Sequence, residues 1–143
     1  MCKTGNSSVS EITVPAAADH LYTVLGFVDE WLKVHGFPEE AAAQVSIAVE
    51  EVFVNIARYA YGPRVGDALV KCAVGGDPLF AVIEFSDRGK PFNPLTRDDP
   101  VLSLPLENRP VGGLGIYLVK KIMDSVQYNY QDDRNILTLR KQL

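Results

Sequence analysis

The stretch from Gln44 to Tyr61 constrains the fold more than any other part of this sequence, because it predicts one long helix with an unusual polar stripe. Apolar residues recur there at helical spacing, namely Val45, Ala48, Val49, Val52 and Ile56. At about 100° per residue, four polar residues share a stripe about 60° wide, namely Gln44, Glu51, Asn55 and Arg58. Further apolar residues, such as Ile47 and Val54, lie on the far side of the helix. We therefore expect a largely buried helix whose polar stripe faces a cavity.

Glu51 and Asn55 form the chemically interesting part of this stripe. They are four residues apart, so their side chains are neighbours on one helical face. A carboxylate beside an amide oxygen suits the binding of a hard cation or the orientation of a nucleophile. The alternative is an ordinary solvated or hydrogen-bonded pair, and this helix by itself does not decide between the two.

Composition excludes several classes of protein. The chain has 143 residues, enough for one domain with a core, and we expect residues 1–143 to form that single domain. Its net charge is −4 and it has no block of basic residues, which argues against direct nucleic-acid binding. We expect neither a membrane-spanning stretch nor a secretory leader, and the only cysteines are Cys2 and Cys72. We expect a cytoplasmic protein that does not enter membranes.

The order of predicted elements indicates an α+β fold. Strands are expected at 8–14, 68–74, 79–86, 126–131 and 135–141, and helices at 17–35, from Pro38 to Tyr61, and from 116 to 123. Most strands follow one another as hairpins, so the sheet should be mixed but mostly antiparallel. The helices should pack on one face of it, giving a two-layer sandwich.

The segment from Asp87 to Gly113 has no periodicity. It contains 27 residues and five of the nine prolines. A loop of this length in a small domain is usually an active-site lid or a binding loop, and otherwise disordered.

Two motifs flank this loop and add to the pair on the central helix. Asp87-Arg88-Gly89-Lys90-Pro91-Phe92 follows the most hydrophobic strand, and its carboxylate can accept a hydrogen bond from an amino group. Gly112-Gly113-Leu114-Gly115 begins a helix, where free backbone N–H groups favour a phosphate. Each motif by itself is also compatible with an ordinary turn. The glycine cluster is neither a Walker A loop nor a dinucleotide-binding fingerprint.

Taken in order, these motifs resemble those of the GHKL (Bergerat-fold) ATPases. Within them the chain is most similar to the small anti-sigma-factor serine/threonine kinases of bacterial partner-switching systems. The resemblance extends from the first strand through RPVGGLGIYLVKKIMD to the terminal ILTLRK. It implies that ATP and Mg²⁺ are bound, that a homodimer forms, and that residues 87–113 act as an ATP lid.

The resemblance also assigns roles to individual residues. Glu51 would be the general base, Asn55 the Mg²⁺ ligand, and Asp87 the acceptor for the adenine amino group. The remaining nucleotide contacts would come from Gly89, Phe92, Gly113, Leu114, Gly115 and Thr138. Two cations, Arg58 and Arg109, are candidates to reach a phosphate; alternatively Arg58 makes a structural ion pair and Arg109 is solvated.

These roles imply a protein serine/threonine kinase. It would transfer the γ-phosphoryl group of Mg-ATP to a Ser or Thr of an anti-anti-sigma (STAS) partner and would regulate a sigma factor or a similar target. The alternatives are a non-catalytic, ATP-gated binding module and, third, an ATPase. A self-contained histidine kinase is not expected, because neither His20 nor His35 lies in a dimerisation hairpin and 143 residues leave no room for one.

Overall fold

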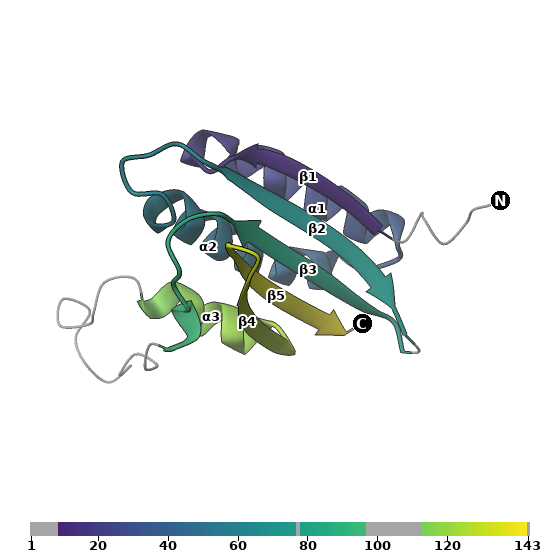
Figure 1. Cartoon of the computed structure of the whole chain (residues 1–143). Coiled ribbons are helices and arrows are strands. Elements are labelled where there is room, and N and C mark those ends of the chain that lie inside the picture. Colours follow the sequence, from purple (N-terminus) through teal and green to yellow (C-terminus); the bar gives the residue numbers. More distant parts are fainter. Residues whose placement is uncertain (1–8, 77, 97–112, 143) are drawn as a thin grey trace.

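The computed structural model describes residues 9–76, 78–96 and 113–142, and within them five strands form one sheet in the order β1-β2-β3-β5-β4 (Figure 1). The strands are β1 (Val9–Pro15), β2 (Asp67–Gly75), β3 (Phe80–Asp87), β4 (Ser125–Gln131) and β5 (Arg134–Gln142). Each neighbouring pair is antiparallel. The expected antiparallel sheet is therefore confirmed, and the described strands contain no parallel pair that would make it mixed.

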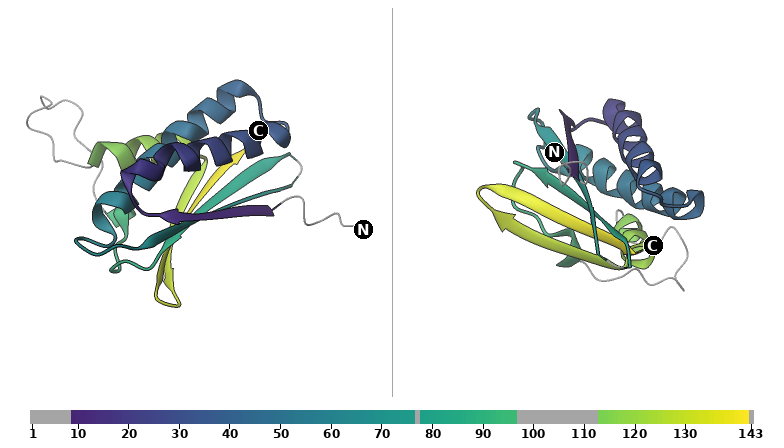
Figure 2. Two further views of the ribbon diagram at one scale, coloured as in Figure 1. Left: turned by 90° about the horizontal axis from the view of Figure 1, so that it is seen from above. Right: turned by 90° about the vertical axis from the view of Figure 1, so that its right-hand side faces the viewer.

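Helices cover one face of this sheet, and the other face is left open (Figure 2). They are α1 (Leu21–Val34), α2 (Glu39–Tyr59) and α3 (Gly113–Ile122), with short 3-10 turns η2 (Ala18–His20) and η3 (Pro94–Thr96). The helix α2 packs between α1 and α3 and contacts both. This arrangement confirms the predicted α+β fold with two layers.

The ends of α2 are set by residues with restricted or unusual backbones. Pro38 occupies the N-cap, and Gly36 before it has a φ of +89°. Beyond the other end, Gly62 has a φ of +58°, which an L-residue with a side chain adopts at a cost. The helix is less buried than predicted: Gln44 and Arg58 are exposed, and Ile47 is 48% exposed. Of the four residues in the predicted polar stripe, only Glu51 and Asn55 are partly buried.

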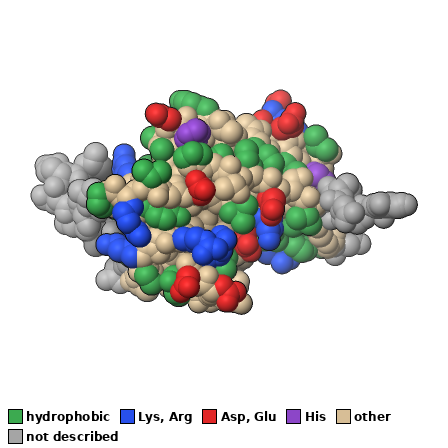
Figure 3. Space-filling model, turned by 45° about the horizontal axis from the view of Figure 1, so that its top comes forward, with side chains coloured by type: hydrophobic (Ala, Val, Ile, Leu, Met, Phe, Trp, Pro, Cys, Tyr) green, Lys and Arg blue, Asp and Glu red, His purple; other side chains and the backbone are tan. Residues whose placement is uncertain are grey.

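Charged and apolar side chains are interspersed on the molecular surface (Figure 3). On the face drawn there, blue Lys and Arg side chains gather in the left half, whereas red acidic side chains are spread more widely. In the described part of the chain, no helix has the length and apolar character that crossing a membrane requires.

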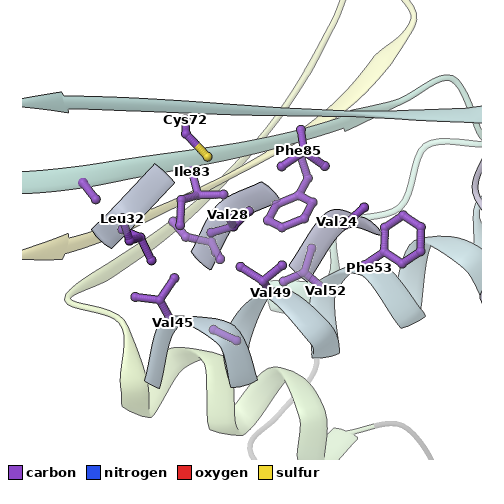
Figure 4. Packing of buried hydrophobic residues seen from close by; sticks show 14 of the residues in the cluster. Val24, Val28, Leu32, Val45, Val49, Val52, Phe53, Cys72, Ile83 and Phe85 are labelled. Carbon is purple, nitrogen blue, oxygen red and sulfur yellow. The ribbon is translucent and has the colours of Figure 1, made fainter. Parts of the chain in front are cut away.

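The core fills the space between the sheet and the helices α1 and α2 (Figure 4). Figure 4 shows side chains of the two helices and of the sheet pointing toward one another. The helices contribute Val28 and Val49, and β2 and β3 contribute Cys72, Ile83 and Phe85. These five are almost completely inaccessible to solvent. Along β3 the buried residues alternate with half-buried ones up to Phe85, because only one face of the strand is covered. Burying this apolar surface is the main term that holds the two layers together.

Candidate nucleotide-binding site

A cavity of about 530 Å³ opens where α2, α3 and the adjacent ends of β3 and β5 meet. Its walls are mostly apolar and include Val52, Ile56, Phe85, Ile116 and Leu137. A few polar side chains also line it, namely Asn55, Asp87, Lys90, Tyr128 and Asn135. A concave, mainly apolar cavity with a few convergent polar groups is typical of a small-molecule site.

Asp87 lies in this cavity at the end of β3 and is only 6% exposed. Its Oδ1 atom accepts two hydrogen bonds, one from the backbone N–H of Gly89 at 2.9 Å and one from the Asn135 amide at 3.0 Å. Among the described residues, no group donates to the other oxygen, Oδ2. The carboxylate is therefore held in one orientation while Oδ2 keeps its capacity to accept a hydrogen bond.

Asn135, at the start of β5, was not predicted from the sequence. It pairs directly with Asp87 across the sheet and is 8% exposed. Its amide nitrogen donates to Asp87 Oδ1 and to the backbone carbonyl of Lys90, the latter at 2.9 Å. Its amide oxygen accepts from the Phe92 N–H at 3.0 Å and from the Tyr128 hydroxyl. Asn135 thus ties together Asp87 and the segment that follows β3.

Tyr128 closes the cavity from β4. Burial raises the pKa of its phenol, the Phe92 backbone hydrogen bond acts in the opposite direction, and the charge of Asp87 raises it further. The hydroxyl is therefore protonated at neutral pH and acts as a donor to Asn135.

Gly89 lies where β3 passes the end of α2. A Cβ atom at this position would overlap the backbone carbonyl of Ala60. The next residue, Lys90, donates its N–H to that same carbonyl at 3.1 Å. The structure therefore explains this glycine by a close contact with the end of α2, whereas the resemblance counted it among the nucleotide contacts.

Glu51 and Gly115 meet across the α2–α3 contact. A Cβ atom on Gly115 would overlap Oε2 of Glu51, so the half-buried carboxylate lies against the start of α3. Asn55, one turn further along α2, lines the cavity itself. The structure thus brings the helix pair, Asp87 and the glycine-rich helix start to one site. Within the described residues, His, Cys, Asp and Glu side chains form no group of three or more suited to a metal ion.

Other predicted site residues are placed differently. Phe92 lines the cavity, but Arg58 is exposed and is not part of its wall. Thr138 does not reach the cavity, because Leu137 and Leu139 face the helices and the side chain between them lies on the opposite face of the sheet. The structure therefore does not bring Thr138 to the cavity, whereas Asn135 of the same strand lines it.

Two parts of the prediction are described only partly or not at all. Gly113 begins α3, and the side chain of its neighbour Leu114 is not among the described ones. Arg109 and most of the predicted lid, residues 97–112, lie outside the described residues. Their roles remain predictions.

Comparison with known proteins shows to which family this chain belongs. Residues 14–141 match the family model described as "Histidine kinase-like ATPase domain". The chain belongs to this family. The predicted resemblance to the GHKL ATPases is thereby confirmed, and Asn55, Asp87 and Phe92, to which the resemblance assigns nucleotide contacts, all line the cavity.

Relatives within the histidine kinase-like ATPase family include bacterial proteins named serine-protein kinase RsbW. The relative from Bacillus mycoides (strain KBAB4) is 27% identical over 131 residues, covering 89% of this chain and 81% of the relative. The one from Bacillus thuringiensis subsp. konkukian is 27% identical over 129 residues, with the same coverage.

Solved structures support the same fold. The RsbU and RsbW domains of a Mycobacterium tuberculosis protein align with a TM-score of 0.66 and 20% identity, over 94% of this chain and 32% of that longer chain. The histidine kinase domain of a blue-light activated kinase from Erythrobacter litoralis aligns with a TM-score of 0.54 and 14% identity, over 91% of this chain and 62% of that one.

Proposed function

We propose that this protein is an ATP-dependent protein serine/threonine kinase that phosphorylates a STAS-type anti-anti-sigma protein and regulates a sigma factor or a similar target. The observation that carries the proposal is the fixed carboxylate of Asp87 in an apolar cavity, with Asn55 on the wall. The relatives named serine-protein kinase support the choice of substrate class.

In this proposal, Asp87 recognises the adenine. Its Oδ1 is occupied by Gly89 and Asn135, which leaves Oδ2 to accept from the exocyclic amino group. The apolar side chains around it, such as Ile56 and Leu137, exclude water from the faces of the base.

Asn55 and Glu51 act where the phosphates of ATP bind. An amide oxygen is a suitable ligand for Mg²⁺, and a site that shares the ion with nucleotide phosphates requires only one or two protein ligands. When bound, Mg²⁺ neutralises charge on the phosphates. The free backbone N–H groups at the start of α3 favour negative charge, and Gly115 in this first turn lies against Glu51.

Glu51 acts as the general base. It accepts the proton of the attacking Ser or Thr hydroxyl while the hydroxyl oxygen bonds to the γ-phosphorus. The bond from the γ-phosphorus to its bridging oxygen breaks, and ADP leaves. Phosphoryl transfer depends mainly on positioning and charge neutralisation, which these groups supply.

Calorimetric titration of ATP, with and without Mg²⁺, tests the site. We expect Mg²⁺-dependent binding that is weakened in Asn55→Ala and lost in Asp87→Asn, and unchanged in Asn129→Ala, an exposed residue on β4. Transfer of labelled phosphate from ATP to a purified STAS-domain protein from the same organism then tests the reaction. Binding without transfer would favour the ATP-gated binding module instead, and absence of binding would refute the whole proposal.

A further inference from the structure

A second cleft lies beside the candidate nucleotide cavity but opens on the other face of the sheet. Its wall includes Ser86, whose neighbour Asp87 belongs to the nucleotide cavity, because successive residues of β3 point to opposite faces. None of the residues to which we assign a role in phosphoryl transfer lines this second cleft.

Three arginines dominate this cleft, and we call it the arginine cleft. Arg64 comes from the loop after α2, Arg88 from the end of β3 and Arg134 from the start of β5. The acidic residue that lines it is Asp67. The cleft therefore concentrates positive charge on a protein whose net charge is −4.

The guanidinium groups of these three arginines make no salt bridge or hydrogen bond to the described residues. The salt bridges between described residues join Lys33 to Asp29 and Lys71 to Glu84, and no hydrogen bond between described groups involves the guanidinium of Arg64, Arg88 or Arg134. An arginine stays charged at every physiological pH and offers five N–H donors in a planar fork that matches a carboxylate. The cleft thus presents three such forks with their donors available.

Tyr61 holds the wall of the arginine cleft in place through hydrogen bonds and packing. Its hydroxyl donates to the backbone carbonyl of Asp67 at 2.6 Å and accepts from the backbone N–H of Arg88 at 2.8 Å. Its ring packs so closely on Gly66 that a Cβ atom there would overlap it. These contacts fasten the loop that carries Arg64 to the strand end that carries Arg88, so the cleft is held open before a ligand arrives.

We propose that the arginine cleft binds an acidic segment of a protein partner. Because three arginines line one cleft, several carboxylates of the same acidic segment can each meet a guanidinium group there. Val65, on its rim and 94% exposed, provides an apolar contact beside the charges. This inference does not depend on the proposed kinase reaction.

Binding of a fluorescein-labelled deca-glutamate peptide, followed by anisotropy at low ionic strength, tests the proposal. The test variant is Arg88→Gln/Arg134→Gln. The matched control is Lys33→Gln/Lys71→Gln, which removes the same charge outside the cleft from surface pairs of little energetic weight. We expect affinity to fall by about tenfold or more in the first variant and by less than about twofold in the second.

Several outcomes would overturn the proposal. Equal loss in both double variants would show a general charge effect, and the absence of peptide binding by the wild type would leave the cleft without the proposed ligand. Displacement of the peptide by sodium phosphate, but not by sodium chloride of equal ionic strength, would identify a small-anion site instead. If the test variant does not fold, judged by its thermal unfolding, the single change Arg64→Gln on the exposed loop replaces it.

Discussion

At the scale of single residues, Asn135 is the clearest determinant of the cavity. Both ends of its amide are engaged, so it fixes Asp87 on one side and Phe92 on the other. A buried polar group that loses its partner costs about 1–3 kcal/mol. Replacing Asn135 leaves several such groups without a partner at once.

We therefore predict that Asn135→Ala lowers the free energy of unfolding by about 1–3 kcal/mol. We also predict that it weakens ATP binding by about tenfold or more, because Asp87 is no longer held in one orientation. Denaturant unfolding and calorimetry measure the two effects. Asn129→Ala is the matched control, since Asn129 is exposed and, among the described residues, its side chain hydrogen-bonds only to Gln131. Equal effects in the two variants would contradict the role of Asn135.

The second prediction at this scale concerns Glu51. Glu51→Gln keeps the size and hydrogen-bonding capacity of the side chain but removes its basicity. We expect ATP affinity to be retained and phosphoryl transfer to a STAS protein to fall by at least about 100-fold, the contribution typical of a general base. Single-turnover transfer measures the second quantity. A Glu51→Gln protein that phosphorylates at the wild-type rate would exclude Glu51 as the base.

The sequence predicted some of these residues and missed others for a physical reason. Glu51, Asn55 and Asp87 stand out because short-range spacing places them on one helix face or at one strand end. Asn135 joins the site through contacts between distant parts of the chain, such as its hydrogen bond with Asp87, 48 residues away. Along β5, Ile136 and Leu137 are both apolar, so alternation did not indicate which face Thr138 occupies.

At the scale of elements, the close contact between the end of α2 and the end of β3 holds the site together. Gly89→Ala would push a methyl group into the carbonyl of Ala60, where the neighbour is backbone and cannot rotate away. We predict a loss of stability of about 1–3 kcal/mol, as for other overpacked contacts. The matched control is Gly26→Ala in α1, where no atom lies within 4 Å of the added Cβ. That change should stabilise the helix by about 0.5–1 kcal/mol. Thermal unfolding of both variants checks the opposite signs.

The contact between α2 and α3 gives a further prediction. In Gly115→Ala, the added methyl group meets the end of a flexible side chain, Oε2 of Glu51, which is able to move aside. We expect little change in stability but a loss of phosphoryl transfer, because the displaced carboxylate no longer faces the attacking hydroxyl. Unchanged transfer in this variant would show that the position of Glu51 against α3 is not required.

Most elements could be predicted from the sequence, since their signals are local. Helical spacing of apolar residues indicated α2 and α3. The short gap between the strands predicted at 126–131 and 135–141 indicated the last hairpin, and in its turn Asp132 and Asp133 both adopt positive φ. The exposure of α2 was misjudged, because Ile47 suggested a partner on its far side and the described structure leaves it 48% exposed. The burial of a helix depends on which other elements pack against it. The spacing of apolar residues along the helix does not show how many of its faces are covered.

At the scale of the whole molecule, the core between the two layers shields Cys72 completely. Burial raises the pKa of this thiol to about 12. The native state therefore binds the proton more tightly than the unfolded state, and this contribution to stability is lost as pH rises from about 9 toward 12. We predict that stability falls less steeply with pH above 9 in Cys72→Ala than in the wild type, measured by denaturant unfolding. Equal slopes would contradict this prediction.

The order of strands in the sheet bears on how the protein is made. Translation delivers β3 long before its neighbour β5, and Asn135 comes later in the chain than nearly every other residue of the cavity wall. Until β5 has emerged from the ribosome, one edge of β3 has no partner and Asp87 has no amide to hold it. Until β5 has been made, a nascent chain therefore lacks the complete candidate site, and binding of ATP there cannot assist its folding.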